Sequence, residues 1–124
     1  MSIEIGDTIL EEAASRYGVT RDRLTKLHHS VITHGADKFV EKALYQFERN
    51  KRSFVLRLTH PKYVDFKLIG GEADWINYLA GNGMTVPRVI PSEDGLLVEL
   101  MKMEDAAYAA VCFEKAEGRE IRFD

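Results

Sequence analysis

The sequence has no long hydrophobic run and no excess of basic residues. No apolar stretch approaches the roughly 18 residues that a membrane-spanning helix needs, so we expect no membrane partner. Residues 1–6 contain neither a basic region nor a following apolar stretch, so no secretory signal is predicted and the cytoplasm is the expected location. A net charge of -3 at pH 7 provides no broad basic field that would attract nucleic acid.

Cysteine is also scarce, and the histidines do not compensate for it. The one cysteine, Cys112, lies in the apolar run 109–113, where a thiol is typically a small buried hydrophobic group. No spacing typical of metal ligands relates the four histidines, which are His28, His29, His34 and His60. We therefore expect an inert thiol and no metal site in this chain.

What is present is the composition of one ordinary globular domain. The 124 residues are 45% hydrophobic and 30% charged. A chain of this length can form a core that is stable alone but has little room for a second unit. Residues 1–124 are therefore expected to form a single domain.

Hydrophobic spacing predicts two helices and five or six strands. Residues 8–17 have apolar positions at helical intervals until Gly18, and a shorter helical turn is expected after Thr20. A second helix is predicted over 69–80. Strand character is found in 30–36, 39–48, 53–59, 86–91, 96–100 and 107–113. This order predicts an α+β fold, in which the helices pack on a mainly antiparallel sheet of five to six strands.

Two charged residues occupy positions that should face the interior. Strand alternation in 53–59 places Arg57 on the same face as Val55, opposite three large apolar residues. Glu72 lies on the side of the second predicted helix that should partly meet the sheet, where a carboxylate needs a partner. The alternatives are an arginine at the margin of the sheet and a first-turn acid favoured by the helix dipole.

Two further segments contain turn signals. The segment 34–40 includes Gly35 and Val40 and is predicted to form a hairpin. The segment 113–118 changes from apolar to polar at Glu114, and its final glycine allows the chain to change direction. A plain hairpin and a solvated C-terminal loop are the alternative interpretations of these two segments.

Taken together, these residues resemble the small lobe of the aminoglycoside phosphotransferase and choline or homoserine kinase-like family. The segment Phe54-Val55-Leu56-Arg57 is similar to the V-A-I-K strand motif of kinases, with arginine in place of lysine. The resemblance implies that Val55 packs on adenine and that Arg57 reaches the phosphates. It also implies that Glu72 holds Arg57 in position.

The same resemblance assigns roles to the two turn segments. It implies that Gly35 and Val40 belong to the hairpin that covers the phosphates. It further implies a hinge whose backbone binds adenine at Glu114 and Ala116. The expected ligand is ATP, with Mg2+ in the complete enzyme, and the expected reaction transfers the γ-phosphate to a substrate hydroxyl.

The catalytic half of such an enzyme has no counterpart in the sequence. Phosphoryl transfer needs a catalytic aspartate on an H-x-D type loop and acidic ligands for magnesium, which this family carries in its large lobe. We therefore expect a truncated nucleotide-binding lobe without catalytic residues of its own. In this interpretation 1–28 is a helical N-terminal extension, and 113–124 is the hinge and the start of a linker to the large lobe. The acceptor substrate is not predicted.

Two alternatives from other functional classes remain. Residues 8–27 have the alanine, glycine and leucine pattern of a helix-turn-helix, whose second helix would present Arg21 and Arg23 to DNA phosphates. The acidic net charge makes this the weaker alternative. The other is a non-catalytic interaction domain, in which an open pocket face supports a homodimer.

Overall fold

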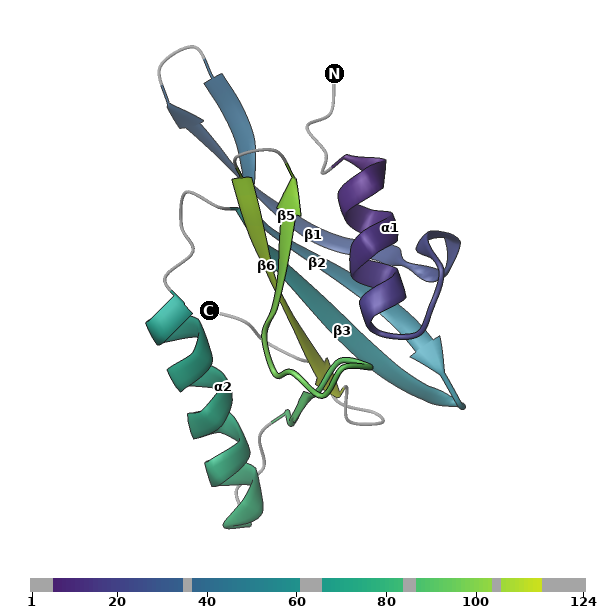
Figure 1. Cartoon of the computed structure of the whole chain (residues 1–124), viewed down its shortest axis with the longest axis vertical. Helices are drawn as coiled ribbons and strands as arrows, with labels where there is room; N and C mark the ends of the chain where they lie inside the picture. The colour runs from purple at the N-terminus through teal and green to yellow at the C-terminus, as the bar shows by residue number, and fades with distance from the viewer. Residues whose placement is uncertain (1–5, 35–36, 61–65, 84–86, 104–105, 115–124) are drawn as a thin grey trace.

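The computed structural model describes residues 6–34, 37–60, 66–83, 87–103 and 106–114 (Figure 1). Helix α1 (Asp7–Arg16) is followed by the short 3-10 turn η1 (Arg21–Arg23). Strands β1 (Thr25–His34), β2 (Asp37–Arg49) and β3 (Arg52–Thr59) precede helix α2 (Phe66–Gly81). The chain then forms β4 (Val89–Ile90), β5 (Glu99–Met103) and β6 (Ala106–Glu114). The predicted α+β class is confirmed.

The six strands form one antiparallel sheet in which β6 pairs with three of the other strands. The strand order is β1-β2-β3-β6-β4, and β5 pairs with the same strand β6. The last part of β6 pairs with β4, through Val89 opposite Phe113, and the first part pairs with β5. Its other edge pairs with β3 over six residue pairs. β6 therefore connects the N-terminal strands to the segment that follows α2.

Strand alternation gives the sheet two different apolar faces. The face that carries Leu56 and Cys112 packs against Leu10 of α1 and against Tyr17, the residue that follows α1, and forms the larger core. The opposite face packs a smaller core around Ala73 of α2, whose other buried members are Val89, Val111 and Phe113. Figure 1 shows the two helices well separated, with α1 on the right and α2 at the lower left. Each helix thus covers a different face of the sheet.

The β2–β3 connection is a two-residue turn at Asn50 and Lys51. Both residues have positive φ, 53° and 65°, and Arg49 pairs directly with Arg52 across the turn. This is the conformation of a type I′ hairpin, whose twist matches that of the strands it joins. The turn fixes the register of β3 against β2.

Three strand boundaries differ from the sequence-based expectation. β1 begins at Thr25, five residues before the predicted start, because pairing with β2 extends the strand through residues 25–29, four of which are polar. β4 has only two residues, not six, since Pro87 and Pro91 flank it and proline cannot donate to a ladder. β5 is displaced by three residues toward the C-terminus, to the positions that pair with β6.

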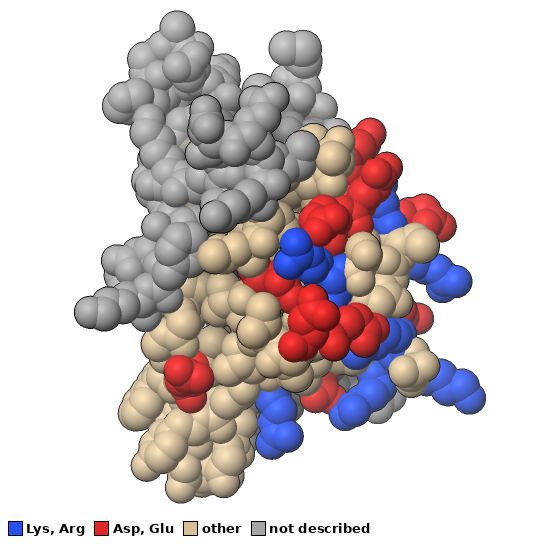
Figure 2. Space-filling view, viewed as in Figure 1, with Lys and Arg blue, Asp and Glu red and all other residues tan. Residues whose placement is uncertain are grey.

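The structure contradicts the helix-turn-helix alternative for residues 8–27. The expected second helix is only the three-residue turn η1, and the chain enters β1 at Thr25. Arg21 is paired with Asp7 at 3.0 Å instead of standing on a recognition helix. In the view of Figure 2, acidic and basic side chains are interspersed on the side of the molecule that carries α1.

A buried carboxylate connects α1 to the second half of the chain. Glu99 of β5 is 1% exposed, and its Oε1 lies 2.6 Å from Nη1 of Arg16 at the end of α1. Its other oxygen accepts a hydrogen bond from the Ser92 hydroxyl at 2.5 Å. The carbonyl of Arg16 accepts a third bond, from the backbone N–H of Glu93. Both oxygens of the buried carboxylate are therefore satisfied.

Replacing Arg16 with alanine is expected to destabilise the fold strongly, because Glu99 would be left charged and buried with only a hydroxyl partner. The expected loss in the free energy of unfolding is on the order of 3 kcal/mol. Glu12→Ala is the control, because it removes the exposed partner of the same arginine and should cost about 0.5 kcal/mol or less. Urea unfolding measures both. Equal effects of the two changes would contradict this account of Glu99.

Candidate functional site

The predicted pair between Arg57 and Glu72 is present. Nη2 of Arg57, on β3, lies 2.7 Å from Oε1 of Glu72, on α2. The side chain of Arg57 is 11% exposed and that of Glu72 is 47% exposed. The pair therefore lies at the edge of the small core, with the cation inside and the carboxylate toward solvent.

The structure excludes the simpler explanations of both residues. β3 is an interior strand that pairs with β2 and β6 on its two sides, so Arg57 is not at the margin of the sheet. α2 begins at Phe66, which places Glu72 beyond the first turn and outside the main influence of the helix dipole. The position of each residue is therefore explained by its partner.

An aromatic ring on β6 supports the guanidinium of Arg57. The guanidinium carbon lies 5.4 Å from the centre of the Phe113 ring, a distance typical of a cation–π contact. Phe113 stands two residues from Val111, which pairs with Arg57 across the sheet, so both side chains share the face of α2. Sequence reasoning did not identify this contact, although the alternation of β6 carried the signal for it.

One donor of Arg57 remains unsatisfied. Its Nε atom is buried and has no hydrogen-bond partner among the residues that the structure describes. Buried donors nearly always have a partner, so an orphaned N–H indicates a place where water or a ligand oxygen is accommodated. A guanidinium offers several donors in a fixed plane, and only one terminal nitrogen is used by Glu72.

The remaining predicted site residues are placed only in part. Val55 is 1% exposed and lies two positions before Arg57 on the same face of β3. Val40 belongs to β2, where its backbone pairs with Val31. Gly35 and Ala116 lie outside the described residues, so their predicted roles stay predictions.

Glu114 ends β6 at the point where a hinge was predicted. Its backbone N–H donates to the carbonyl of Arg88 at 2.8 Å, just before β4. Its carboxylate is paired with Arg52, the first residue of β3. The last described residue of the sheet is therefore tied to two neighbouring segments.

The thiol of Cys112 is inert, as predicted. It is a free cysteine, 1% exposed, on the face of β6 that meets α1. Burial raises the pKa of Cys112 to about 12, so the nucleophilic thiolate is scarce near neutral pH.

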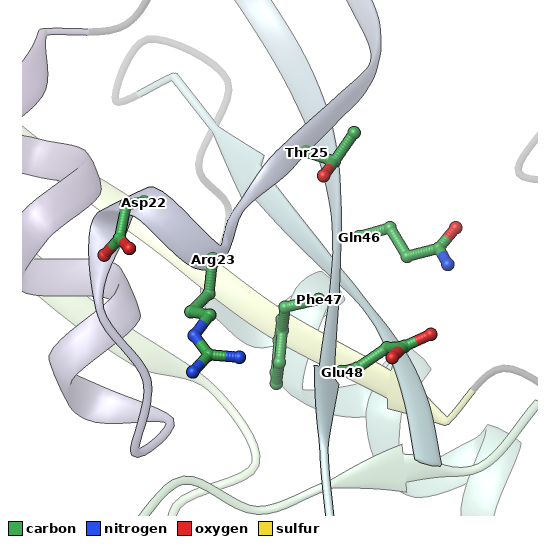
Figure 3. Close-up of a pocket in the computed structure, with 6 residues that line it drawn as sticks. All are labelled: Asp22, Arg23, Thr25, Gln46, Phe47 and Glu48. Atoms are coloured by element: carbon green, nitrogen blue, oxygen red, sulfur yellow. The ribbon is translucent and has the colours of Figure 1, made fainter. Parts of the chain in front are cut away.

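A hollow on another part of the molecule contains none of the predicted site residues. It has a volume of about 380 Å³, lies between η1 and β2, and is lined by Asp22, Arg23, Thr25, Gln46, Phe47 and Glu48 (Figure 3). Its lining mixes both charge signs, with Asp22 and Glu48 beside Arg23. Neither Arg57 nor Glu72 is among the residues that line this hollow.

Fold and site together define the small lobe of a kinase-like fold. Its marks are a buried cation on the third strand of an antiparallel sheet, a glutamate on the following helix, and a last strand that ends at Glu114. The chain is 28% identical over 116 residues to an amicoumacin kinase of Bacillus subtilis (strain 168), a match that covers 93% of this chain and 32% of that protein.

Solved structures agree with this comparison. A structure of an amicoumacin kinase in complex with AMP-PNP, Ca2+ and Ami matches 95% of this chain and 33% of its own, with a TM-score of 0.79 and 28% identity. A microcompartment-associated aminopropanol kinase matches with a TM-score of 0.65 and 28% identity, over 93% of this chain and 33% of its own.

A more distant likeness concerns the fold alone. A spectinomycin phosphotransferase in complex with ADP and spectinomycin has a TM-score of 0.53 and 15% identity, over 94% of this chain and 31% of its own. No family model matches the chain. This chain is therefore similar over most of its length to two small-molecule kinases, and it spans about a third of the length of these relatives.

No helix in the described part of the chain is long and apolar enough to cross a membrane.

Removal of the Glu72 carboxylate is expected to lower the stability of the fold, because the nearly buried guanidinium of Arg57 would lose its charged partner. We expect Glu72→Ala to reduce the free energy of unfolding by about 1–3 kcal/mol. Asp74→Ala, an exposed acid on the same helix, should change it by about 0.5 kcal/mol or less. Denaturant unfolding of both variants tests this. A loss at Asp74 as large as that at Glu72 would show that the pair contributes nothing specific.

Proposed function

We propose that this chain is the ATP-binding small lobe of an aminoglycoside phosphotransferase-like kinase that transfers the γ-phosphate to the hydroxyl of a small molecule. The observation that carries the proposal is the buried, ring-supported Arg57, which is held by Glu72 and retains an unsatisfied Nε donor. A charged group in such a setting is costly, and a role in binding an anion explains why it is kept.

The chemistry of Arg57 fits a phosphate. One terminal nitrogen is committed to Glu72, which leaves Nε and the other terminal nitrogen as donors in one plane. Guanidinium groups bind phosphate oxygens through charge-assisted hydrogen bonds, which are stronger than those between neutral groups. In this proposal Val55 contributes apolar surface under the base, and the backbone at Glu114 and Ala116 forms the adenine hinge.

The relatives support a nucleotide with a divalent ion. The amicoumacin kinase structure contains AMP-PNP and Ca2+, and the spectinomycin phosphotransferase structure contains ADP. For this chain we propose ATP with Mg2+. In the described ranges no group of three or more His, Cys, Asp or Glu side chains is placed to hold a metal. Ligands for Mg2+ are therefore expected from the phosphates themselves and from residues outside those ranges.

The catalytic groups are expected on a large lobe that pairs with this one. The proposal follows from the relatives, of which this chain matches about a third. That lobe would supply the catalytic aspartate and the acceptor site, so the isolated chain is expected to bind nucleotide weakly and not to turn over. We propose a cytoplasmic location for the whole enzyme.

A non-catalytic interaction domain is the second candidate, and one observation favours it. Trp75 and Tyr78 on α2 are 59% and 60% exposed and stack with ring centroids 5.6 Å apart. Figure 2 shows that the visible surface at the lower left, where α2 lies, has few charged side chains. Exposed aromatic surface of this kind is typical of contact sites, including those of homodimers.

A Mg-ATP titration followed by amide chemical shifts tests the first candidate. We expect shifts that cluster at Val55, Arg57, Glu72 and Glu114. In Arg57→Met they should require about 10- to 100-fold more nucleotide, the equivalent of losing charged hydrogen bonds. Methionine should preserve the fold, since an apolar residue of similar size commonly replaces a buried charge without loss of stability.

Arg21→Met is the matched control, because Arg21 is an exposed arginine that pairs with Asp7 far from α2. Identical titrations for both variants would refute a phosphate role for Arg57. Light scattering on the same samples separates the second candidate, which requires a mass of twice the monomer that falls in a Trp75→Ala variant.

A further inference from the structure

We infer that Asn77 is a positioning residue for the Arg57–Glu72 pair, because its side chain fixes α2 to the sheet in the one orientation that brings Glu72 to Arg57. The inference rests on the proposed function only for its effect on nucleotide binding. Its structural part stands on contacts within the chain.

The side-chain amide of Asn77 pairs with the backbone of Val89 as a neighbouring strand would. Its Nδ2 donates to the carbonyl oxygen of Val89 at 3.1 Å, and its Oδ1 accepts from the backbone N–H of the same residue at 2.8 Å. Val89 belongs to β4, an edge strand of two residues, whose polar groups on the outer side have no further strand to pair with. The amide satisfies both groups of one residue at once.

These bonds close a loop of contacts around the site. Val89 pairs with Phe113 on β6, and the Phe113 ring lies under the guanidinium of Arg57. Arg57 is bonded to Glu72, five residues before Asn77 on the same helix. The strand residue that anchors the helix and the ring that supports the cation are therefore direct neighbours in the sheet.

Two attachments on α2 restrict its rotation and its height more than either attachment does alone. Five residues of an α-helix correspond to a rotation of about 140° and a rise of about 7.5 Å, so Glu72 and Asn77 leave α2 on different sides and at different heights. Only one combination of rotation and height satisfies both.

The apolar contacts of α2 alone cannot fix its rotation and its height against the sheet. Among residues 69–81 of α2, Ala73 is the only one that is fully buried, and its side chain is a single methyl group. The partly buried Ile69 and Ile76 complete its packing. Apolar packing is not directional, whereas hydrogen bonds require defined angles.

The test compares Asn77→Ala with Asn82→Ala. Asn82 is exposed directly after the last residue of the same helix, and its Nδ2 donates to the carbonyl of Tyr78 in the last turn of α2 at 2.8 Å. Both changes remove one asparagine amide from the same segment, but only the first separates α2 from β4. A general effect of asparagine loss is therefore common to both.

The first measurement is the Nε–Hε signal of Arg57 in the NMR spectrum of the nucleotide-free chain. In the unchanged protein and in Asn82→Ala we expect a signal distinct from those of exposed arginines and protected from exchange with water. In Asn77→Ala it should move toward the exposed position and exchange at least tenfold faster. An Arg57 signal unaffected by Asn77→Ala, or affected equally by Asn82→Ala, would overturn the inference.

The second measurement is a double-mutant cycle on Mg-ATP affinity with Asn77→Ala and Glu72→Ala. If Asn77 acts through the pair, its replacement weakens binding about tenfold when the paired state falls to a tenth of its population. It should then have little further effect once Glu72 is absent. Fully additive effects would contradict action through Glu72.

Two safeguards keep the outcomes separate. Asn77→Asp retains the acceptor for the Val89 N–H and loses the donor, so it should give an intermediate Arg57 signal if Asn77→Ala does not fold. If no form of the chain binds Mg-ATP, the proposed function fails, while the Arg57 signal still decides the positioning role of Asn77.

Discussion

The pairing of β6 with three other strands is the constraint on which the rest of the structure depends. Its backbone joins β3, β4 and β5, and residues Ala109 to Phe113 are all 2% exposed or less. Alternate side chains enter the two cores, with Cys112 toward α1 and Phe113 toward α2. One strand therefore fixes both helices, and it reaches Glu114 with little freedom in its direction.

The two faces of the sheet have different tasks as a result. The α1 face is a large apolar core with one satisfied carboxylate at its margin, and its contribution is stability. The α2 face has a small apolar core and accommodates a guanidinium that retains an unsatisfied donor. A protein optimised only for stability would replace such a cation with an apolar side chain, so its presence is more consistent with binding than with folding.

Local pattern predicted the parts of this molecule that depend on alternation. The period of two in β3 placed Arg57 on the other face of the sheet from Leu56, and helical spacing placed Glu72 toward the sheet. The resemblance to kinases then linked the two residues as a pair. Asn77 could not be found in this way, because it bonds the backbone of Val89, and backbone groups are the same in every residue type. The early start of β1 was missed for a related reason, since its polar first residues depend on a partner strand distant in sequence.

The turn at Asn50 and Lys51 determines which side of the sheet each residue of β3 faces. With two residues in the turn, Arg49 faces Arg52, and every second residue from there onward is assigned to one side of the sheet. A turn with one residue more or fewer would exchange the two sides, sending the guanidinium of Arg57 into the aliphatic layer under α1 and Leu56 toward Glu72. Lysine tolerates its left-handed backbone less readily than glycine does. The chain therefore accepts local strain at the surface to keep Arg57 on the side where it has a partner.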